Sequence, residues 1–63
     1  MSTYEDIKHK MLYAVILFDL LENHPRDISN AYYSLMKYKE KQEEYEECHV
    51  IKKAIEHYKK IIK

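Results

Sequence analysis

The sequence predicts an all-helical protein, and three observations support this fold class. The chain of 63 residues contains no glycine and one proline, so the residues that build tight hairpins and left-handed turns are nearly absent. Apolar residues recur at alternating spacings of three and four, which is the period of a helix face. Charged residues make up 35% of the chain and separate the apolar ones. We therefore expect helices that pack through their apolar faces.

The first expected helix covers about residues 3–22. Thr3 can cap its start, and Asp6 completes a spacing close to that of a capping box. A narrow polar strip contains Lys8, Asp19 and Glu22, and apolar side chains fill most of the remaining circumference. Such a helix needs partners on at least two sides. One of its faces follows a heptad spacing, which consists of Tyr4, Ile7, Met11, Ala14, Phe18 and Leu21.

A turn is expected at about residues 23–26, because the residue before Pro25 is biased away from helical dihedral angles. A second helix then begins near residue 27. No residue between there and the end of the chain breaks a helix by composition, although the heptad phase slips near the charged segment 43–47. The number of helices therefore depends on whether the chain turns at that segment.

Two architectures follow. In the first, a helix over about residues 27–62 forms a helical hairpin with the short first helix, and two hairpins pair into a dimeric four-helix bundle. In the second, a break near residues 43–47 gives a three-helix bundle. We favour the hairpin, because the segment contains strong helix formers and none of the usual turn residues. Either way, the chain forms a single helical domain.

Self-association is expected from both architectures. A domain of this size buries only about 60% of the surface that its unfolded chain exposes. Cys48 is the single cysteine and cannot form a disulfide within the chain, so we expect a homodimer to supply the missing stability. The expected dimer core consists of Met11, Ala14, Phe18, Leu21, Ile51, Ile55 and Ile62.

Composition and spacing argue against several function classes. Eleven basic and eleven acidic residues give a formal net charge of zero, which argues against a DNA mimic and against a dedicated DNA-binding protein. The apolar run at residues 11–21 is about half the length of a membrane span, and no signal-peptide cleavage site follows it. Histidine and cysteine lack zinc-site spacing, and no nucleophile has a suitably placed base. We expect a cytoplasmic protein with no enzymatic activity, metal or cofactor.

The remaining candidates are binding surfaces. Tyrosine occurs seven times and combines a large apolar area with a polar tip, as interface residues often do. The residues expected to contact a protein partner are Tyr32, Tyr33, Met36, Tyr38 and Tyr45. The last helix also has a basic side that can contact phosphate groups. Its candidate anion contacts are Lys52, Lys53, Lys59, Lys60 and Lys63.

Our leading hypothesis is a small helical adaptor or regulator that acts through protein–protein interaction. Its size and its lack of catalytic groups are typical of a viral or mobile-element effector or inhibitor. The alternative is a nucleic-acid-binding accessory protein that uses the lysine-rich face of the last helix. Asp19 raises a separate question, because a carboxylate on a largely buried helix must reach solvent or meet a donor. A tyrosine hydroxyl, His24 or a lysine of another helix can serve.

Overall fold

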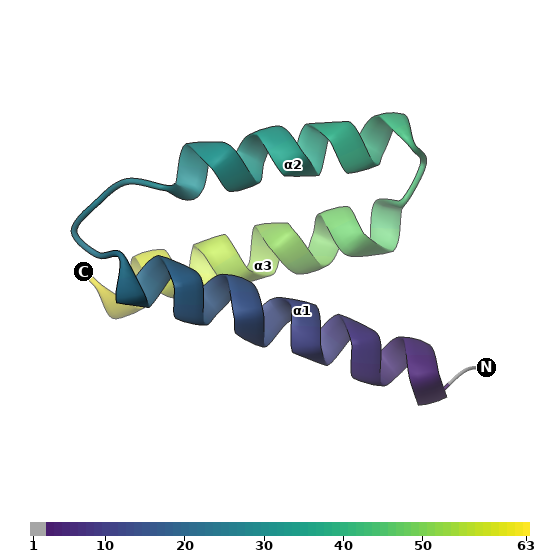
Figure 1. Cartoon of the computed structure of the whole chain (residues 1–63), viewed down its shortest axis with the longest axis horizontal. Coiled ribbons are helices and arrows are strands. Elements are labelled where there is room, and N and C mark those ends of the chain that lie inside the picture. The colour runs from purple at the N-terminus through teal and green to yellow at the C-terminus, as the bar shows by residue number, and fades with distance from the viewer. Residues whose placement is uncertain (1–2) are drawn as a thin grey trace.

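The computed structural model describes residues 3–63, and this part of the chain forms three helices without any strand (Figure 1). The helices are α1 (Thr3–Glu22), α2 (Ser29–Lys41) and α3 (Tyr45–Ile61). The predicted all-helical class is confirmed. The three-helix alternative fits the chain better than the hairpin with a long second helix.

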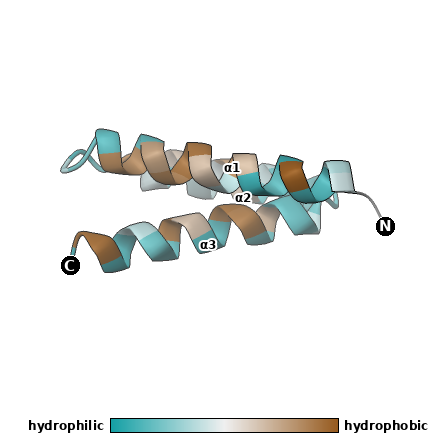
Figure 2. Cartoon of the chain, turned by 90° about the horizontal axis from the view of Figure 1, so that it is seen from below, coloured by the Kyte–Doolittle hydropathy of each residue, from teal (hydrophilic) through white to brown (hydrophobic). Residues whose placement is uncertain are grey.

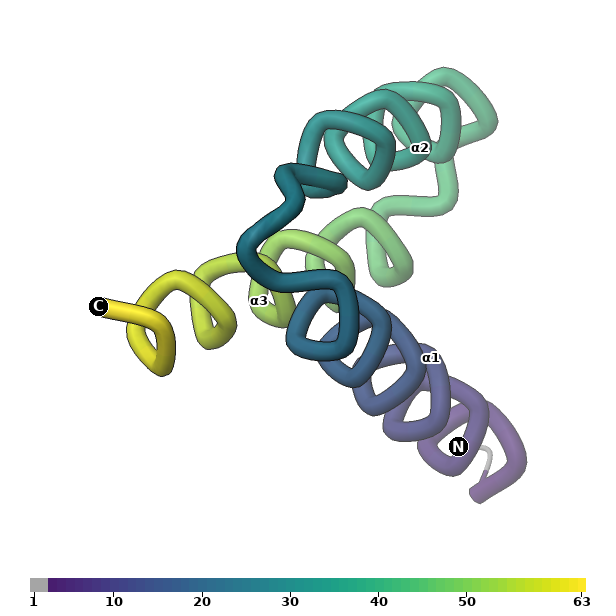
Figure 3. The backbone as a smooth tube through the Cα atoms, turned by 60° about the vertical axis from the view of Figure 1, so that its left-hand side comes forward, coloured from purple at the N-terminus to yellow at the C-terminus, as the bar shows by residue number. Residues whose placement is uncertain are grey.

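Helix α3 is the central element, because both of the other helices pack against it. Helices α2 and α3 are joined by a short turn and run in opposite directions (Figure 1). Helices α1 and α2 diverge on either side of α3 (Figure 3). One face of α3 therefore supplies apolar side chains to both neighbours.

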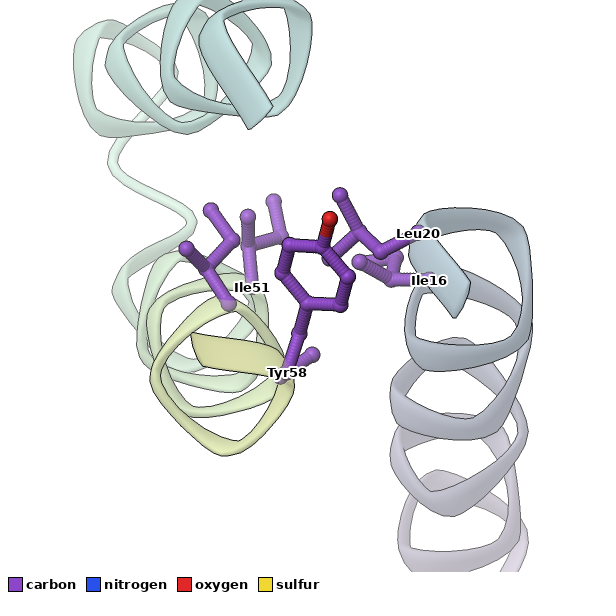
Figure 4. Packing of buried hydrophobic residues seen from close by; sticks show 6 residues of the cluster. Ile16, Leu20, Ile51 and Tyr58 are labelled. Carbon is purple, nitrogen blue, oxygen red and sulfur yellow. The ribbon is translucent and has the colours of Figure 1, made fainter. Parts of the chain in front are cut away.

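The buried core lies where α1 meets α3. Four of its residues fall on one face of α3, and two come from the second half of α1. In Figure 4 the Tyr58 ring extends from α3 toward Ile16 and Leu20, and its hydroxyl is hydrogen-bonded to Nδ1 of His24 at 3.0 Å. Partly buried residues of α2 pack against the same cluster. The buried apolar residues are Ile16, Leu20, Ile51, Ala54, Ile55 and Tyr58.

The connection between α1 and α2 is longer than expected, because α2 begins at Ser29. Asp27 lies just before it and accepts hydrogen bonds from the Ser29 hydroxyl (2.6 Å) and the Ser29 backbone N–H (3.1 Å). The bond from the hydroxyl, followed by that from the N–H, lowers the pKa of Asp27. Side-chain bonds of this kind stabilise a turn and compete with a helix. Asp27 therefore delays the start of α2.

The long helix predicted for residues 27–62 does not form, because residues 42–44 turn the chain between α2 and α3. Glu43 adopts a left-handed backbone conformation with φ of 61°. Its N–H donates to the Glu40 carbonyl at 3.0 Å, and the Glu44 N–H donates to the Lys39 carbonyl at 2.9 Å. This pair of bonds is a Schellman motif, in which glycine usually occupies the left-handed position. The turn therefore forms without its preferred residue.

Ion pairs on both sides of this turn support it. Lys39 Nζ lies 3.0 Å from Glu47 Oε1 and 3.7 Å from Glu44 Oε1. Lys8 Nζ of α1 lies 3.7 Å from Glu47 Oε2. The hydrogen bond between Lys39 and Glu47 lowers the pKa of Glu47 and raises that of Lys39. Glu44 and Glu47 are therefore paired with lysines of the same chain.

Replacement of Glu43 by glycine should stabilise the fold. A left-handed conformation costs a residue with a Cβ atom roughly 1–2 kcal/mol, and part of this gain is lost to the greater freedom of glycine in the unfolded chain. We expect Glu43→Gly to raise the free energy of unfolding by about 0.5–1 kcal/mol, measured by urea denaturation. The control Glu46→Gly, in the first turn of α3, should instead lower it, because glycine disfavours a helix and a carboxylate is lost from the N-terminal end of the helix. Equal losses in both variants would contradict the assignment of the turn.

Candidate functional site

Helix α1 has one buried apolar face and one exposed apolar face. Ile16 and Leu20 are buried against α3. Five large apolar side chains lie on roughly the opposite side of the helix, and each is between 51% and 74% exposed. Figure 2 shows apolar residues along most of the length of α1. We call the exposed set the outer face; it consists of Tyr4, Ile7, Met11, Val15 and Phe18.

The outer face is large for a chain of this size. A fully exposed side chain of this kind presents on the order of 150–200 Å², so the five together expose about 600 Å². The largest apolar patch on a typical monomeric protein is roughly 300–600 Å², and patches of that size often mark interaction sites. The outer face is therefore the strongest candidate for a binding surface in the described residues.

The residues predicted to form a dimer core do not share one environment. Met11 and Phe18 belong to the outer face, and Ala14 and Leu21, at its edge, are partly buried. Ile51 and Ile55 are fully buried in the core of their own chain. They pack there because the chain turns at residues 42–44 and folds α3 back into the molecule. Ile62 is exposed at the C-terminal end of α3.

The residues predicted to contact a protein partner also divide. Tyr32, Tyr33 and Met36 are partly buried and pack against the core of their own chain. Lys59 Nζ lies 5.4 Å from the centre of the Tyr33 ring and donates to its hydroxyl at 3.2 Å. Tyr38 and Tyr45 are exposed. Three of these five residues thus hold the fold together.

Asp19 meets its donors within the chain. The Tyr32 hydroxyl of α2 donates to Asp19 Oδ2, and Asn23 Nδ2 donates to Asp19 Oδ1 at 2.8 Å. Burial raises the pKa of Tyr32 to about 12, helped by the hydrogen bond to Asp19 and by the negative charge of Asp19. The tyrosine hydroxyl, one of the donors considered from the sequence, therefore ties α1 to α2.

Cys48 also has a structural role. Its thiol donates to the backbone carbonyl of Met36 at 3.1 Å, which links α3 to α2. Burial raises the pKa of the thiol, and the nearby carboxylates of Glu40 and Glu44 raise it further. Because the thiolate is the reactive form, this environment disfavours chemistry at the sulfur.

A groove of about 660 Å³ lies between α1 and α3. One wall carries His9, Lys10 and Tyr13 of α1, and the other carries side chains of α3 that include His57. The Tyr13 hydroxyl is hydrogen-bonded to Nδ1 of His57, and the two rings lie 6.0 Å apart between centroids. We call this feature the α1–α3 groove.

Only some of the lysines that were predicted to contact anions lie in the α1–α3 groove. Lys53 and Lys60 line it, together with Lys10. Lys52 and Lys63 are exposed outside it, and Lys59 lies on another side of α3, with Tyr33. The basic side of α3 predicted Lys53 and Lys60 as anion contacts. Lys10 was not predicted as a contact, because the packing of α1 on α3 leaves no periodic signal in the sequence.

Residues 3–63 contain no group of three or more histidine, cysteine, aspartate or glutamate side chains placed to hold a metal ion. No helix in the same range is long and apolar enough to cross a membrane.

Comparison with known proteins adds no relative. The chain matches no protein-family model, and no curated protein or solved structure is significantly similar to it.

Loss of the Tyr32 hydroxyl should change how stability depends on pH. The pKa of Tyr32 is raised on folding, so its contribution is complete below about pH 10, the ordinary tyrosine value, and declines as the pH rises toward about 12. Tyr32→Phe should lower the free energy of unfolding by about 1 kcal/mol at pH 8. The variant should then lose less stability than the parent between pH 10 and pH 12.

Urea denaturation monitored by circular dichroism measures both effects. The matched control is Tyr38→Phe, because Tyr38 lies on the same helix and is exposed. The free energy of unfolding of this variant should equal that of the parent protein at every pH. The same loss in the Tyr32 and Tyr38 variants would show that the bond to Asp19 does not support the fold.

Proposed function

We propose that this chain is a non-enzymatic protein-interaction module that binds through the outer face of α1, and that its first partner is a second copy of itself. The observation that carries the proposal is the exposure of five large apolar side chains along one side of a helix whose other side is already buried. Water contact with such a surface is unfavourable, and coverage by a partner removes it.

A second copy suits the outer face in pattern and in area. Tyr4, Ile7, Met11 and Phe18 follow the alternating spacing of three and four residues that lets two helices pair along a seam. If both copies bury this face, the interface covers about 1,200 Å² in total, at the lower end of the range for stable complexes. These two properties favour self-association of modest affinity.

An antiparallel arrangement of the two α1 helices fits the side chains best. It places the large Met11 opposite the small Ala14 of the second copy, and Ile7 opposite Phe18. It also sets the two helix dipoles in opposite directions. This dimer differs from the four-helix bundle of long hairpins, because the apolar face of α3 is already covered within each chain.

The wider role that we propose is that of a small adaptor or regulator, of the kind that viruses and mobile elements use as effectors or inhibitors. Its support is the combination of a binding face with a single thiol, Cys48, that donates within the chain and whose pKa is raised. Tyr38 and Tyr45 are exposed and remain available to another protein.

A charge placed in the outer face should abolish the dimer. Phe18→Glu buries a carboxylate in the interface, where its desolvation is unfavourable, so we expect a monomer at concentrations of tens of micromolar at which the parent protein dimerises. Sedimentation equilibrium measures the mass of each. Ile61→Glu is the matched control, because Ile61 is an exposed apolar residue outside this face. A monomeric parent protein at these concentrations would refute the proposal.

The antiparallel arrangement has a separate test, in a Cys48→Ser background. A disulfide needs Cα atoms within about 7 Å, so Ile7→Cys chains should cross-link to Phe18→Cys chains when the two are mixed. Each variant alone should cross-link much less. Efficient cross-linking of the Ile7→Cys chain with itself would indicate parallel helices instead.

A further inference from the structure

We infer that the α1–α3 groove is a binding site for single-stranded nucleic acid. The inference does not require the proposed dimer, because none of the residues that line the groove belongs to the outer face. It concerns Lys10, Tyr13, Lys53, His57 and Lys60, which the fold brings together from two helices.

Positive charge is concentrated in the α1–α3 groove. The chain as a whole has no net charge, yet Lys10, Lys53 and Lys60 line one groove and Glu56 is the only carboxylate among its lining residues. His9, His49 and His57 add further hydrogen-bonding nitrogens, so three of the four histidines of the chain line this groove. Such a concentration of donors and positive charge suits phosphate oxygens.

The lysines of the groove lie on both of its walls. Lys53 and Lys60 are two turns apart on α3, a separation of about 10 Å along the helix axis, and Lys10 stands on the opposite wall. The positive charge therefore follows the length of the groove on both sides. An extended chain of phosphates matches this distribution better than one compact anion does.

Apolar and aromatic side chains line the groove together with these cations. Tyr13 and His57 present neighbouring rings whose planes are inclined by 31°, and Val50 adds an aliphatic surface. Proteins that bind single strands combine a positive groove for the backbone with aromatic side chains on which bases stack. Paired bases in a duplex are already stacked and do not offer their faces, so the groove favours a single strand.

The groove volume is compatible with this ligand. At about 660 Å³ it lies within the range of roughly 300–1,000 Å³ that is common for small-molecule sites. It is therefore large enough for a short segment of one strand, with the remaining nucleotides outside it.

Fluorescence anisotropy with a labelled oligothymidylate of about 12 nucleotides tests the inference on the full chain. The parent protein should bind this strand, and three phosphate contacts predict a slope of about −2 for the logarithm of affinity against the logarithm of salt concentration. The same sequence in a duplex should bind at least tenfold more weakly, and thymidine monophosphate should compete only poorly. Equal binding of the duplex, or binding of anionic phosphatidylserine vesicles without binding of the strand, would overturn the inference.

Matched lysine variants separate the groove from general electrostatic attraction. Lys53→Gln with Lys60→Gln should weaken binding about tenfold. Lys52→Gln with Lys63→Gln removes the same charge from the same part of the chain but outside the groove, and should change affinity less than about twofold. Glu56→Gln should strengthen binding, because it removes the carboxylate of the groove. Equal losses in the two double variants would refute the site.

Tyr13 tests the stacking contact. Tyr13→Phe keeps the ring and should bind the strand nearly as well as the parent, whereas Tyr13→Leu keeps apolar volume without the ring and should bind several-fold more weakly. Circular dichroism checks that both variants remain helical. Identical affinities for the leucine and phenylalanine variants would contradict stacking. Phe18→Glu should bind the strand as tightly as the parent, so failure of the dimer and failure of the groove are distinguishable.

Discussion

The contact between α1 and α3 determines the rest of this structure. Ile16 and Leu20 of α1 pack with Ile51 and Ile55 of α3 in the only fully buried layer among the described residues. This contact sets the rotation of α1 about its own axis. Because α1 is apolar on both sides, the rotation decides which side is covered and which becomes the outer face. The α1–α3 groove lies along the edge of the same contact.

The charges are distributed unevenly in a chain without net charge. Near the turn between α2 and α3, Glu44 and Glu47 pair with Lys39, and Glu47 also pairs with Lys8. These carboxylates are neutralised locally and support the turn. Among residues 3–63, no carboxylate lies at salt-bridge distance from the lysines of the groove, so positive charge remains there. A net charge of zero therefore conceals one acidic region, in which Glu44 and Glu47 are paired, and one groove lined by three lysines and a single carboxylate.

Polar side chains of the core have partners within the chain, and these partners join the helices in pairs. Tyr32 connects α2 to Asp19 of α1, and the Cys48 thiol connects α3 to a carbonyl of α2. Each bond satisfies a group that is costly to bury alone. Such links give a small domain specific helix positions that an apolar core of six residues would define less closely.

Local sequence determined the helical class, the approximate extent of α1 and its excess of apolar surface, because helix periodicity is a property of neighbouring residues. It also indicated that Asp19 needs a donor and which kinds of side chain can supply it. Only the tertiary structure decided the turn at Glu43, since packing of α2 on α3 stabilises a backbone conformation that glutamate disfavours by itself. The same packing buried Ile51 and Ile55 and placed Lys10 across from Lys53 and Lys60. Contacts between residues some forty positions apart are set by how helices fold back on one another, and no short-range pattern records them.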